Sequence, residues 1–376
     1  MSVRYHEGKF PPQDIDWKRI AAPLERATVA VARYDSFLGV IPDASILASP
    51  MLVQEAVASS RIEGTHATVS DVLMFEAGGG DFSPAQHDDV LEVANYRRAL
   101  ARADEMMREM PICGRILRSA HEILLKDVRG GFKSPGRYRV DQNWIGTSDQ
   151  IEEAKYVPIA PDHLQDGMAR WERFVNESED PALVKVSIAH AEFESLHPFL
   201  DGNGRIGRML VPLMMHADGV IAHPCFYLSE FFEHRNAEYQ ERLRAVSSDD
   251  AWTDWIVFFL GAIESQARVN DEKAHQIYDL YKMMLREVMG QTKAEGAGRA
   301  VDCLFRSAIF PASVFVKEAG MSETASRRLI GNLKKSGRLI EMRPHKGSMP
   351  AILAFPELLK VTEGLTIRRP PEAADK

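Results

Sequence analysis

The chain of 376 residues carries a net charge of −8, and 45% of its residues are hydrophobic. This length predicts two or three domains, and the composition is that of an ordinary globular protein. The net negative charge argues against a protein that binds polyanions over its whole surface.

Neither a leader peptide nor a membrane span is expected. The N-terminal segment is polar and lacks the apolar centre of a signal peptide, and no run of about 18 apolar residues occurs. The three cysteines, Cys113, Cys225 and Cys303, lie far apart and show no metal-ligand spacing. These features predict a protein of the reducing cytoplasm and argue against a zinc site.

The first predicted region, residues 1–108, is helical. Apolar spacing predicts a helix over residues 15–37. A second helix is predicted over 50–63, because Ser49 is a good N-cap, Pro50 suits the first turn and Gly64 suits the residue past the end. In the last turn of this second helix, Ser59 and Glu63 are four residues apart and share a face. Taken alone, that pattern is typical of a solvated helix end.

Further helices are predicted over about 69–75, 84–107 and 114–125, and His121 in the last of them is expected to be a core or boundary residue. Residues 129–161 break the helical pattern and carry strand-type residues, which predicts a hairpin. Its arms are expected near 144–146 and 156–159, with a polar tip at 147–153. By itself, such a hairpin is also consistent with a simple cover over helices.

The stretch His197–Arg208 joins two predicted helices, 181–196 and 206–215. Gly202 and Gly204 can take positive φ, so they can turn backbone N–H groups toward one point. The following helix adds its unpaired first-turn N–H groups and the positive end of its dipole. The stretch therefore predicts an anion cradle.

Charged side chains complete this cradle. Arg205 and Arg208 offer planar forks that match phosphate oxygens. Asp201 is a hard oxygen ligand suited to Mg²⁺ between phosphates, and His197 can accept a proton from an attacking hydroxyl. Each residue alone is more often structural, but together they indicate transfer chemistry on a nucleotide.

The same stretch resembles the signature of the Fic family (filamentation induced by cyclic AMP), His-x-Phe-x-Asp/Glu-Gly-Asn-Gly-Arg-x-x-Arg. It matches at every defining position, from His197 and Phe199 to Arg208. The resemblance implies transfer of AMP from ATP to a hydroxyl side chain of a protein, with release of pyrophosphate. The phosphorylating death-on-curing branch has Lys in place of Gly204, so nucleotidyl transfer is favoured.

The resemblance also implies a role for each residue. His197 would be the general base, Asp201 the Mg²⁺ ligand and Phe199 a core anchor. Arg205 would hold the β-phosphate and Arg208 the γ-phosphate. The implied ATP-binding set is Gly202, Asn203, Gly204, Arg205, Ile206, Gly207 and Arg208.

Three other segments resemble parts of Fic proteins. Ser59–Gly64 resembles the inhibitory signature Ser/Thr-x-x-x-Glu-Asn/Gly, which implies that Glu63 pairs with Arg208, obstructs the γ-phosphate and keeps basal activity low. The hairpin at 144–159 resembles the flap, which docks a target segment by strand addition; the implied docking residues are Tyr156, Val157, Pro158 and Ile159. Residues 228–239 resemble a segment near the nucleotide base, which places Asn236 and Tyr239 there, with aromatic packing as the alternative.

The C-terminal tail follows a predicted linker at 293–298. Helices expected near 300–308, 311–319 and 323–335, followed by strands at 339–342 and 351–355, predict a winged-helix domain. The tail is net basic, and its third helix carries Arg327, Arg328, Lys334 and Lys335. Two uses are open for it, which are DNA binding and docking of a partner or a second copy.

Together these patterns predict a mainly α protein with an N-terminal helical region at 1–108, a Fic catalytic core at 109–290 and a winged-helix-like domain at 299–376. The predicted function is a protein adenylyltransferase that uses ATP and Mg²⁺ to modify Ser, Thr or Tyr hydroxyls of target proteins and of itself. The alternatives are a nucleotide-sensing winged-helix transcriptional regulator and a Fic enzyme that transfers UMP or phosphocholine or removes AMP. A homodimer is left open.

Overall fold

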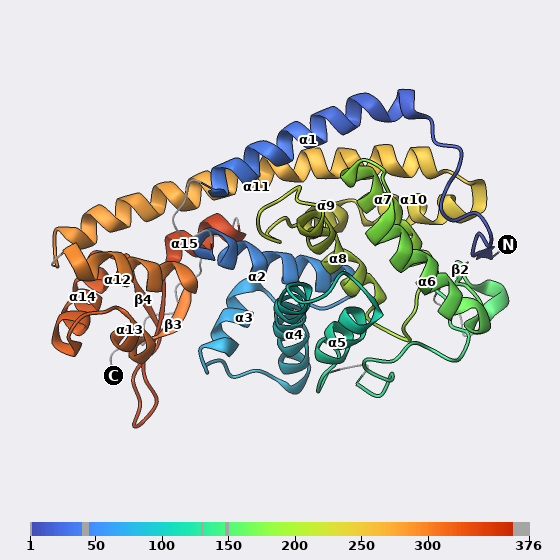
Figure 1. The fold of residues 1–376 in the computed structure, drawn as a ribbon. Helices are drawn as coiled ribbons and strands as arrows, with labels where there is room; N and C mark the ends of the chain where they lie inside the picture. Colours follow the sequence, from blue (N-terminus) through green and yellow to red (C-terminus); the bar gives the residue numbers. More distant parts are fainter. Residues whose placement is uncertain (1, 40–44, 129–130, 147–149, 293, 364–376) are drawn as a thin grey trace. The chain divides into compact units, whose positions relative to one another are not determined.

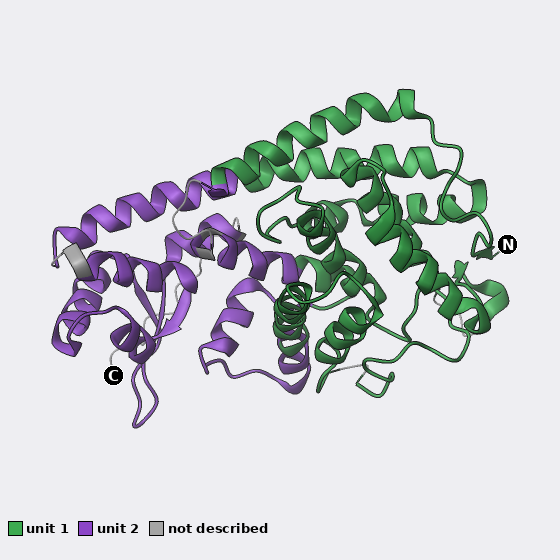
Figure 2. Cartoon of the chain, in the orientation of Figure 1, with its two compact units in different colours: residues 1–37, 58–65, 91–270 green, residues 38–57, 66–90, 271–376 purple. Residues whose placement is uncertain are grey.

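The structure is a computed structural model that describes residues 2–39, 45–128, 131–146, 150–292 and 294–363. The chain forms two compact units, shown in Figure 2. Unit 1 contains residues 1–37, 58–65 and 91–270, and unit 2 contains residues 38–57, 66–90 and 271–376. Helices dominate both units (Figure 1), so the predicted mainly α class is confirmed.

The helices are α1 Trp17–Gly39, α2 Ser45–Ile62, α3 Val69–Glu76, α4 Pro84–Met107, α5 Gly114–Leu124, α6 Pro161–Glu177, α7 Ala182–Leu196, α8 Asn203–Ala217, α9 Ser229–His234, α10 Asn236–Asp249, α11 Trp252–Met289, α12 Ala294–Arg306, α13 Ala312–Glu318, α14 Glu323–Lys335 and α15 Pro356–Glu363. The strands are β1 Val3–Arg4, β2 Tyr156–Val157, β3 Ile309–Pro311, β4 Ile340–Arg343 and β5 Ile352–Ala354. Among these described helices, none is both long and apolar enough to cross a membrane.

Helix α7 is the centre of unit 1. Its apolar residues lie on all sides and it is almost entirely buried, as expected for a helix inside a core. It packs against α6 and α8. Two buried tryptophans fix it from its neighbours, because the Trp171 indole N–H donates to the Ala189 carbonyl (2.8 Å) and that of Trp255 donates to the Ser187 carbonyl (2.7 Å). The residues that follow α7 therefore start from a fixed position.

The predicted hairpin is present in unit 1. Ile145 pairs with Tyr156 in an antiparallel bridge, while the part of the predicted tip at 147–149 lies outside the described residues. An unpredicted strand, β1, pairs in parallel with β2, with Val3 opposite Tyr156. The N-terminal arm, which precedes the first predicted helix, therefore occupies one edge of the hairpin.

Helix α2 starts earlier than predicted. It begins at Ser45, with Pro50 inside the helix. Ser49 does not cap it, because the Ser49 hydroxyl donates instead to the Arg306 carbonyl (2.9 Å) within unit 2. The sequence pattern of Ser followed by Pro resembled a helix start, but this tertiary contact gives the serine another partner.

Unit 2 contains a three-stranded antiparallel sheet in the order β3-β5-β4. The segment runs helix, strand, helix, helix and hairpin, which adds β3 to the predicted elements. The predicted linker at 293–298 is wrong from residue 294 on, because α12 begins there. Ala297 is fully buried, and Gly296 leaves no room for a Cβ beside Met321, so these small residues serve close packing.

The predicted domain boundaries at 108, 109–290 and 299 are consecutive, whereas the two compact units interleave segments of the chain. Compactness in the structure does not show that a segment folds on its own, so the compact units do not test these boundaries. The predicted domains, including the winged-helix-like domain whose residues 364–376 lie outside the described structure, stay predictions.

Candidate active site

The site is built on the loop between α7 and α8. His197 ends α7 in the left-handed conformation (φ 47°), which is uncommon for a residue other than glycine and recurs at functional sites. Gly202 precedes α8 with φ 75°, where its lack of a Cβ is needed. The Asn203 side chain closes the loop, because its Oδ1 accepts from the Phe199 N–H and its Nδ2 donates to the Phe199 carbonyl, both at 2.8 Å.

Two residues outside the loop hold it in place. The His121 ring stacks on the buried Phe199 ring with centroids 3.8 Å apart, and its Nε2 donates to the Asp201 carbonyl (2.9 Å). His121 is fully buried, which lowers its pKa to about 4, so its expected role as a core residue is confirmed. Arg139 donates from Nε to the His197 carbonyl (2.9 Å) and from Nη2 to the Leu196 carbonyl (3.2 Å).

His197 has the properties of a general base. Its Nδ1 lies 3.3 Å from the Glu194 carbonyl. A carbonyl only accepts hydrogen bonds, so Nδ1 carries the proton and Nε2 is free to accept one. Burial lowers the pKa of His197 to about 4. The imidazole is therefore neutral at pH 7 and ready to take a proton from a hydroxyl.

The start of α8 offers backbone donors to an anion. The N–H groups of Asn203, Gly204 and Arg205 belong to the first helical turn, where no carbonyl lies four residues back in the helix, and the dipole end is positive. Gly204 is needed here for close approach, because a Cβ would collide with Glu63 Oε1. A carboxylate thus already lies against the predicted anion cradle.

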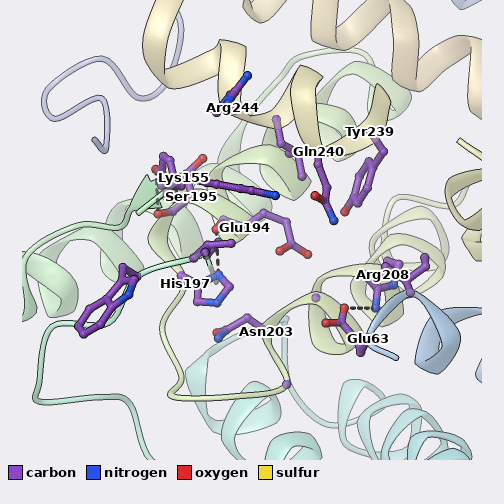
Figure 3. Close-up of a pocket in the computed structure, with 18 of the residues that line it drawn as sticks. Glu63, Lys155, Glu194, Ser195, His197, Asn203, Arg208, Tyr239, Gln240 and Arg244 are labelled. Carbon is purple, nitrogen blue, oxygen red and sulfur yellow. Dashed lines mark hydrogen bonds and ion pairs between the residues drawn. The ribbon is translucent and has the colours of Figure 1, made fainter. Parts of the chain in front are cut away.

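That carboxylate belongs to Glu63, just past the end of α2. Its Oε1 accepts from Arg208 Nη2 at 2.7 Å, and Arg208 also donates to the Ser59 hydroxyl and the Ser59 carbonyl, both at 2.9 Å (Figure 3). Burial alone would raise the pKa of Glu63, but the Arg208 guanidinium lowers it below its ordinary value. The predicted contact between Glu63 and Arg208 is therefore present, with both partners charged at neutral pH.

Arg205 is differently placed. Its guanidinium is buried, with Nη1 3.4 Å from Glu92 Oε2 and Nη2 3.4 Å from Asp201 Oδ1. Glu92 in turn accepts from the Thr65 hydroxyl (2.8 Å). In this arrangement Arg205 braces the loop, and its predicted contact with the β-phosphate stays a prediction.

A cavity of about 590 Å³ brings most of the predicted site together, a size typical of small-molecule sites. Figure 3 shows His197, Asn203, Arg208 and Glu63 around it. The predicted residues that line it are Glu63, Tyr156, His197, Asp201, Gly202, Asn203, Gly204, Arg208 and Tyr239. Ser59, Arg205, Ile206, Gly207, Asn236, Val157, Pro158 and Ile159 are not among its lining residues.

The two predicted base contacts differ from each other. Tyr239 lines the cavity, but it is buried, stacks on Phe232 with ring centroids 4.2 Å apart, and its hydroxyl lies 2.8 Å from His190 Nε2. Asn236 lies at the start of α10, where its Oδ1 accepts from Gln240 (3.0 Å). Aromatic packing, the alternative that the sequence left open, accounts for Tyr239 in this structure.

The predicted docking residues 156–159 are all buried. Their backbone carbonyls already have partners, because Tyr156 accepts from Ile145 (2.9 Å) and Val157 from Tyr5 (3.0 Å). The Pro158 carbonyl accepts from Gln142 (3.2 Å) and that of Ile159 from Arg139 (2.5 Å). The carbonyls of residues 156–159 therefore already have partners, whereas Ile145 in the other arm is 39% exposed.

Asp201 suits a magnesium ion that is shared with phosphates. Its side chain is 41% exposed and lines the cavity beside the cradle, and its Oδ1 accepts from the Gly202 N–H (2.5 Å). Within the described residues, no cluster of three or more acidic, histidine or cysteine side chains could hold a metal by itself. One carboxylate completed by substrate oxygens is an arrangement that Mg²⁺ accepts in proteins, so the residues fit this ion.

Three residues near the site were missed from the sequence, namely Glu92, Arg139 and Glu194. Glu92 and Arg139 lie more than 50 residues from their partners, and Glu194 lies inside a helix without a motif. Local spacing in the sequence therefore gives no signal for them. Glu194 lines the cavity three residues before His197, in a helix that also contains Lys185 and Glu192, so its charge alone did not mark it out.

Comparison with known proteins agrees with this site. Residues 21–105 match the family described as Fic/DOC family N-terminal, and residues 111–215 match the Fic/DOC family. A relative from Caenorhabditis briggsae, named protein adenylyltransferase fic-1, is 29% identical over 119 residues, which cover 28% of this chain and 22% of that protein. Protein adenylyltransferase Fic of Drosophila yakuba is 35% identical over 86 residues, covering 22% and 16% of the two chains. Each match thus covers about a fifth of the relative's own length.

Solved structures show the same fold. A Fic family protein from Desulfovibrio desulfuricans G20 superimposes with a TM-score of 0.58 at 20% identity, covering 92% of this chain and 98% of that chain. Residues 134–508 of Fic-1 from Caenorhabditis elegans give a TM-score of 0.53 at 17% identity, covering 68% and 72%. With the signature at 197–208, the family matches and this fold, the chain belongs to the Fic/DOC family.

Proposed function

We propose that this protein is an adenylyltransferase that moves AMP from ATP to hydroxyl side chains of target proteins. The observation that carries the proposal is the geometry of one cavity. The accepting Nε2 of a neutral His197 lies in it together with the N-terminal turn of α8 and the Arg208 guanidinium. The names of the matched relatives support the same activity.

The chemistry follows from these residues. His197 Nε2 takes the proton of the target hydroxyl, whose oxygen attacks the α-phosphorus of ATP. The bond from the α-phosphorus to the bridging oxygen breaks, and pyrophosphate leaves. The N–H groups of the cradle stabilise the negative charge on the phosphates. Asp201 would hold Mg²⁺, which screens this charge when bound.

Glu63 makes this site autoinhibited. Its carboxylate lies against Gly204 and occupies the Arg208 fork, which is the position that a γ-phosphate needs. ATP must therefore displace a charge-assisted hydrogen bond of 2.7 Å before its triphosphate can bind. Because the Glu63 side chain is 38% exposed, it can move away without opening the protein core.

A target segment would add as a strand to the outer arm of the hairpin. The backbone of Ile145 faces Tyr156, so in a pleated strand its neighbours Trp144 and Gly146 direct their N–H and C=O groups to the other side. Trp144, Ile145 and Gly146 also line the cavity. Pairing there would bring a target hydroxyl toward His197 while reading little of its sequence.

The test is transfer of label from α-labelled ATP with Mg²⁺ to protein. Loss of a charge-assisted hydrogen bond of about 1.5–3 kcal/mol predicts that Glu63→Gly raises transfer roughly 10- to 100-fold. Adding His197→Ala should abolish it. The matched control is His223→Ala in the Glu63→Gly background, because His223 is exposed and does not line this cavity.

The other hypotheses make different predictions in the same assay. If no variant transfers label while ATP still binds, the regulator hypothesis or another donor takes precedence. Competition by UTP would identify a UMP donor, and loss of label from modified protein would identify removal of AMP. The DNA hypothesis gains little from α14, because Arg327 pairs with Glu323 and Lys334 with Glu341. It stays a prediction, as does the homodimer.

A further inference from the structure

The cavity holds a second acidic side chain, Glu194, that the proposed mechanism does not use. Glu194 lies in the last turn of α7 and lines the same cavity as the phosphate cradle. Figure 3 shows its carboxyl group directed into the cavity, between the labelled His197 and Tyr239. A carboxyl group in that position is close enough to a bound triphosphate to affect how it binds.

One oxygen of the Glu194 carboxyl, Oε1, is unpaired within the described protein. Its Oε1 is buried and has no hydrogen-bond partner among the described residues. The same oxygen lies against the backbone of α8, where a Cβ on Gly207 would collide with it. Enclosing an unpartnered oxygen costs more free energy when the group is charged than when it is neutral, so this packing favours the neutral carboxylic acid.

The surroundings of Glu194 allow its carboxyl to be either neutral or ionised near pH 7. Burial raises the pKa of its carboxyl, Arg208 lowers it and Glu63 raises it, with a result of about 7. The other charged or titratable groups that line the cavity are His197, Asp201, Lys155, Tyr156, Tyr239, Glu241 and Arg244. Among these, burial holds His197 neutral and keeps the pKa of Tyr239 well above its ordinary value. Neither ring therefore changes charge near pH 7.

We propose that Glu194 binds the phosphates of the nucleotide as a neutral carboxylic acid, so that nucleotide binding takes up a proton from solvent. A triphosphate in the cradle brings more negative charge than the Glu63 carboxylate that it displaces, and nearby negative charge favours the neutral acid. The neutral acid has an O–H that can donate to a phosphate oxygen, whereas the carboxylate would repel it. This proposal rests on the proposed nucleotide site but not on transfer of AMP.

The experiment is isothermal titration calorimetry in the Glu63→Gly background, in which the anion site is open. The probes are α,β-methylene-ATP, which resists transfer, and inorganic tripolyphosphate, which lacks ribose and base. Each titration is repeated at pH 7 in two buffers that differ in ionisation enthalpy, so that proton uptake is measured directly. Glu194→Gln in the same background cannot titrate, and its values are subtracted to remove the titration of the probe itself.

With Glu194 present, binding of either probe should be accompanied by uptake of roughly half a proton to one proton more than in the Glu194→Gln variant. Their affinity should fall by up to about tenfold for each pH unit above 7, relative to that variant. Glu194→Asp should restore the pH dependence if the variant remains folded, as thermal unfolding would show.

Several outcomes would overturn the proposal. Equal proton uptake in both variants, or binding of neither probe, would remove Glu194 as a phosphate ligand. Proton release with α,β-methylene-ATP but not with tripolyphosphate would instead make Glu194 an ionised acceptor for the ribose or base. Failure of the proposed function looks different, because label transfer would then be absent while binding with proton uptake persists.

Discussion

Two arginines on α8, only three residues apart, have different kinds of acidic partner. Arg205 and its partner Glu92 are both buried, with side chains 4% and 5% exposed. Arg208 is equally buried, but its partner Glu63 is 38% exposed and lines the cavity. An acid that is enclosed with its base cannot be exchanged for a ligand, whereas an acid that reaches a cavity can be. We therefore expect the first pair to stabilise the fold and, under the proposed function, the second pair to control access to the site.

The largest expected effect is on stability. Glu92→Leu leaves the buried Arg205 with its 3.4 Å contact to the partly exposed Asp201 as its remaining ion pair among the described residues, which should cost about 3–5 kcal/mol of unfolding free energy. Glu63→Gln should cost under about 1 kcal/mol, because water can reach that pair. Urea unfolding of both variants measures the difference. Similar losses would mean that the two pairs are not distinct in kind.

The next effect is on nucleotide affinity. In the Glu63→Gly background, Arg208→Lys keeps the charge but loses the planar fork, so ATP affinity should fall about tenfold or more. Arg205→Lys should change ATP affinity by less than about threefold, while lowering the unfolding temperature. Calorimetric titration with α,β-methylene-ATP provides the affinities. Equal losses would instead support the predicted contact of Arg205 with the β-phosphate.

The contrast between these arginines also marks how far the sequence could be read. The His197–Arg208 stretch predicted an anion cradle between two helices, and α7 and α8 do flank it. The contact between Glu63 and Arg208 was predicted as well, because each residue sits in a recognisable pattern. Arg205 has the same local pattern as Arg208, so nothing in its spacing revealed that Glu92, 113 residues away, would bind it.

The misjudged features have the same cause. Strand β1 covers the hairpin edge because distant residues meet, and a two-residue strand has no periodicity to detect. Helix α2 extends past the proline that was expected to start it. In α12, buried small residues were mistaken for a linker. Composition predicts local conformation, but in these three segments packing against distant residues determines the conformation that forms.

A smaller effect is expected at Gly204, which lies beside the exchangeable pair. A methyl group there would collide with Glu63 and lie 2.8 Å from Arg208 Nη1, so Gly204→Ala should displace Glu63. The same methyl group fills the cradle, and label transfer should be about tenfold lower than with Glu63→Gly alone, even when the two changes are combined. Gly261→Ala, in the middle of α11 with open space around it, is the matched control. If Gly204→Ala instead raised label transfer, Glu63 would block the site from a position that phosphate does not occupy.

The smallest effect is on the pH dependence of transfer at saturating ATP. Burial lowers the pKa of His197 to about 4, so the base stays neutral as the pH falls from 8 to 5.5. The Glu63–Arg208 contact also persists over this range, because the pKa of Glu63 is lowered and the contact is lost only as pH falls through that lowered value.

The transfer rate of Glu63→Gly, and its ratio to that of the parent, should therefore change less than about twofold between pH 8 and 5.5. A histidine with its ordinary pKa of about 6.5 would lose roughly tenfold over the same range. Such a loss would mean that nucleotide or target binding exposes His197 to water or brings negative charge to it. Glu194→Gln separates a loss caused by His197 from one caused by Glu194, because it removes the other group expected to titrate near pH 7 while leaving His197 in place.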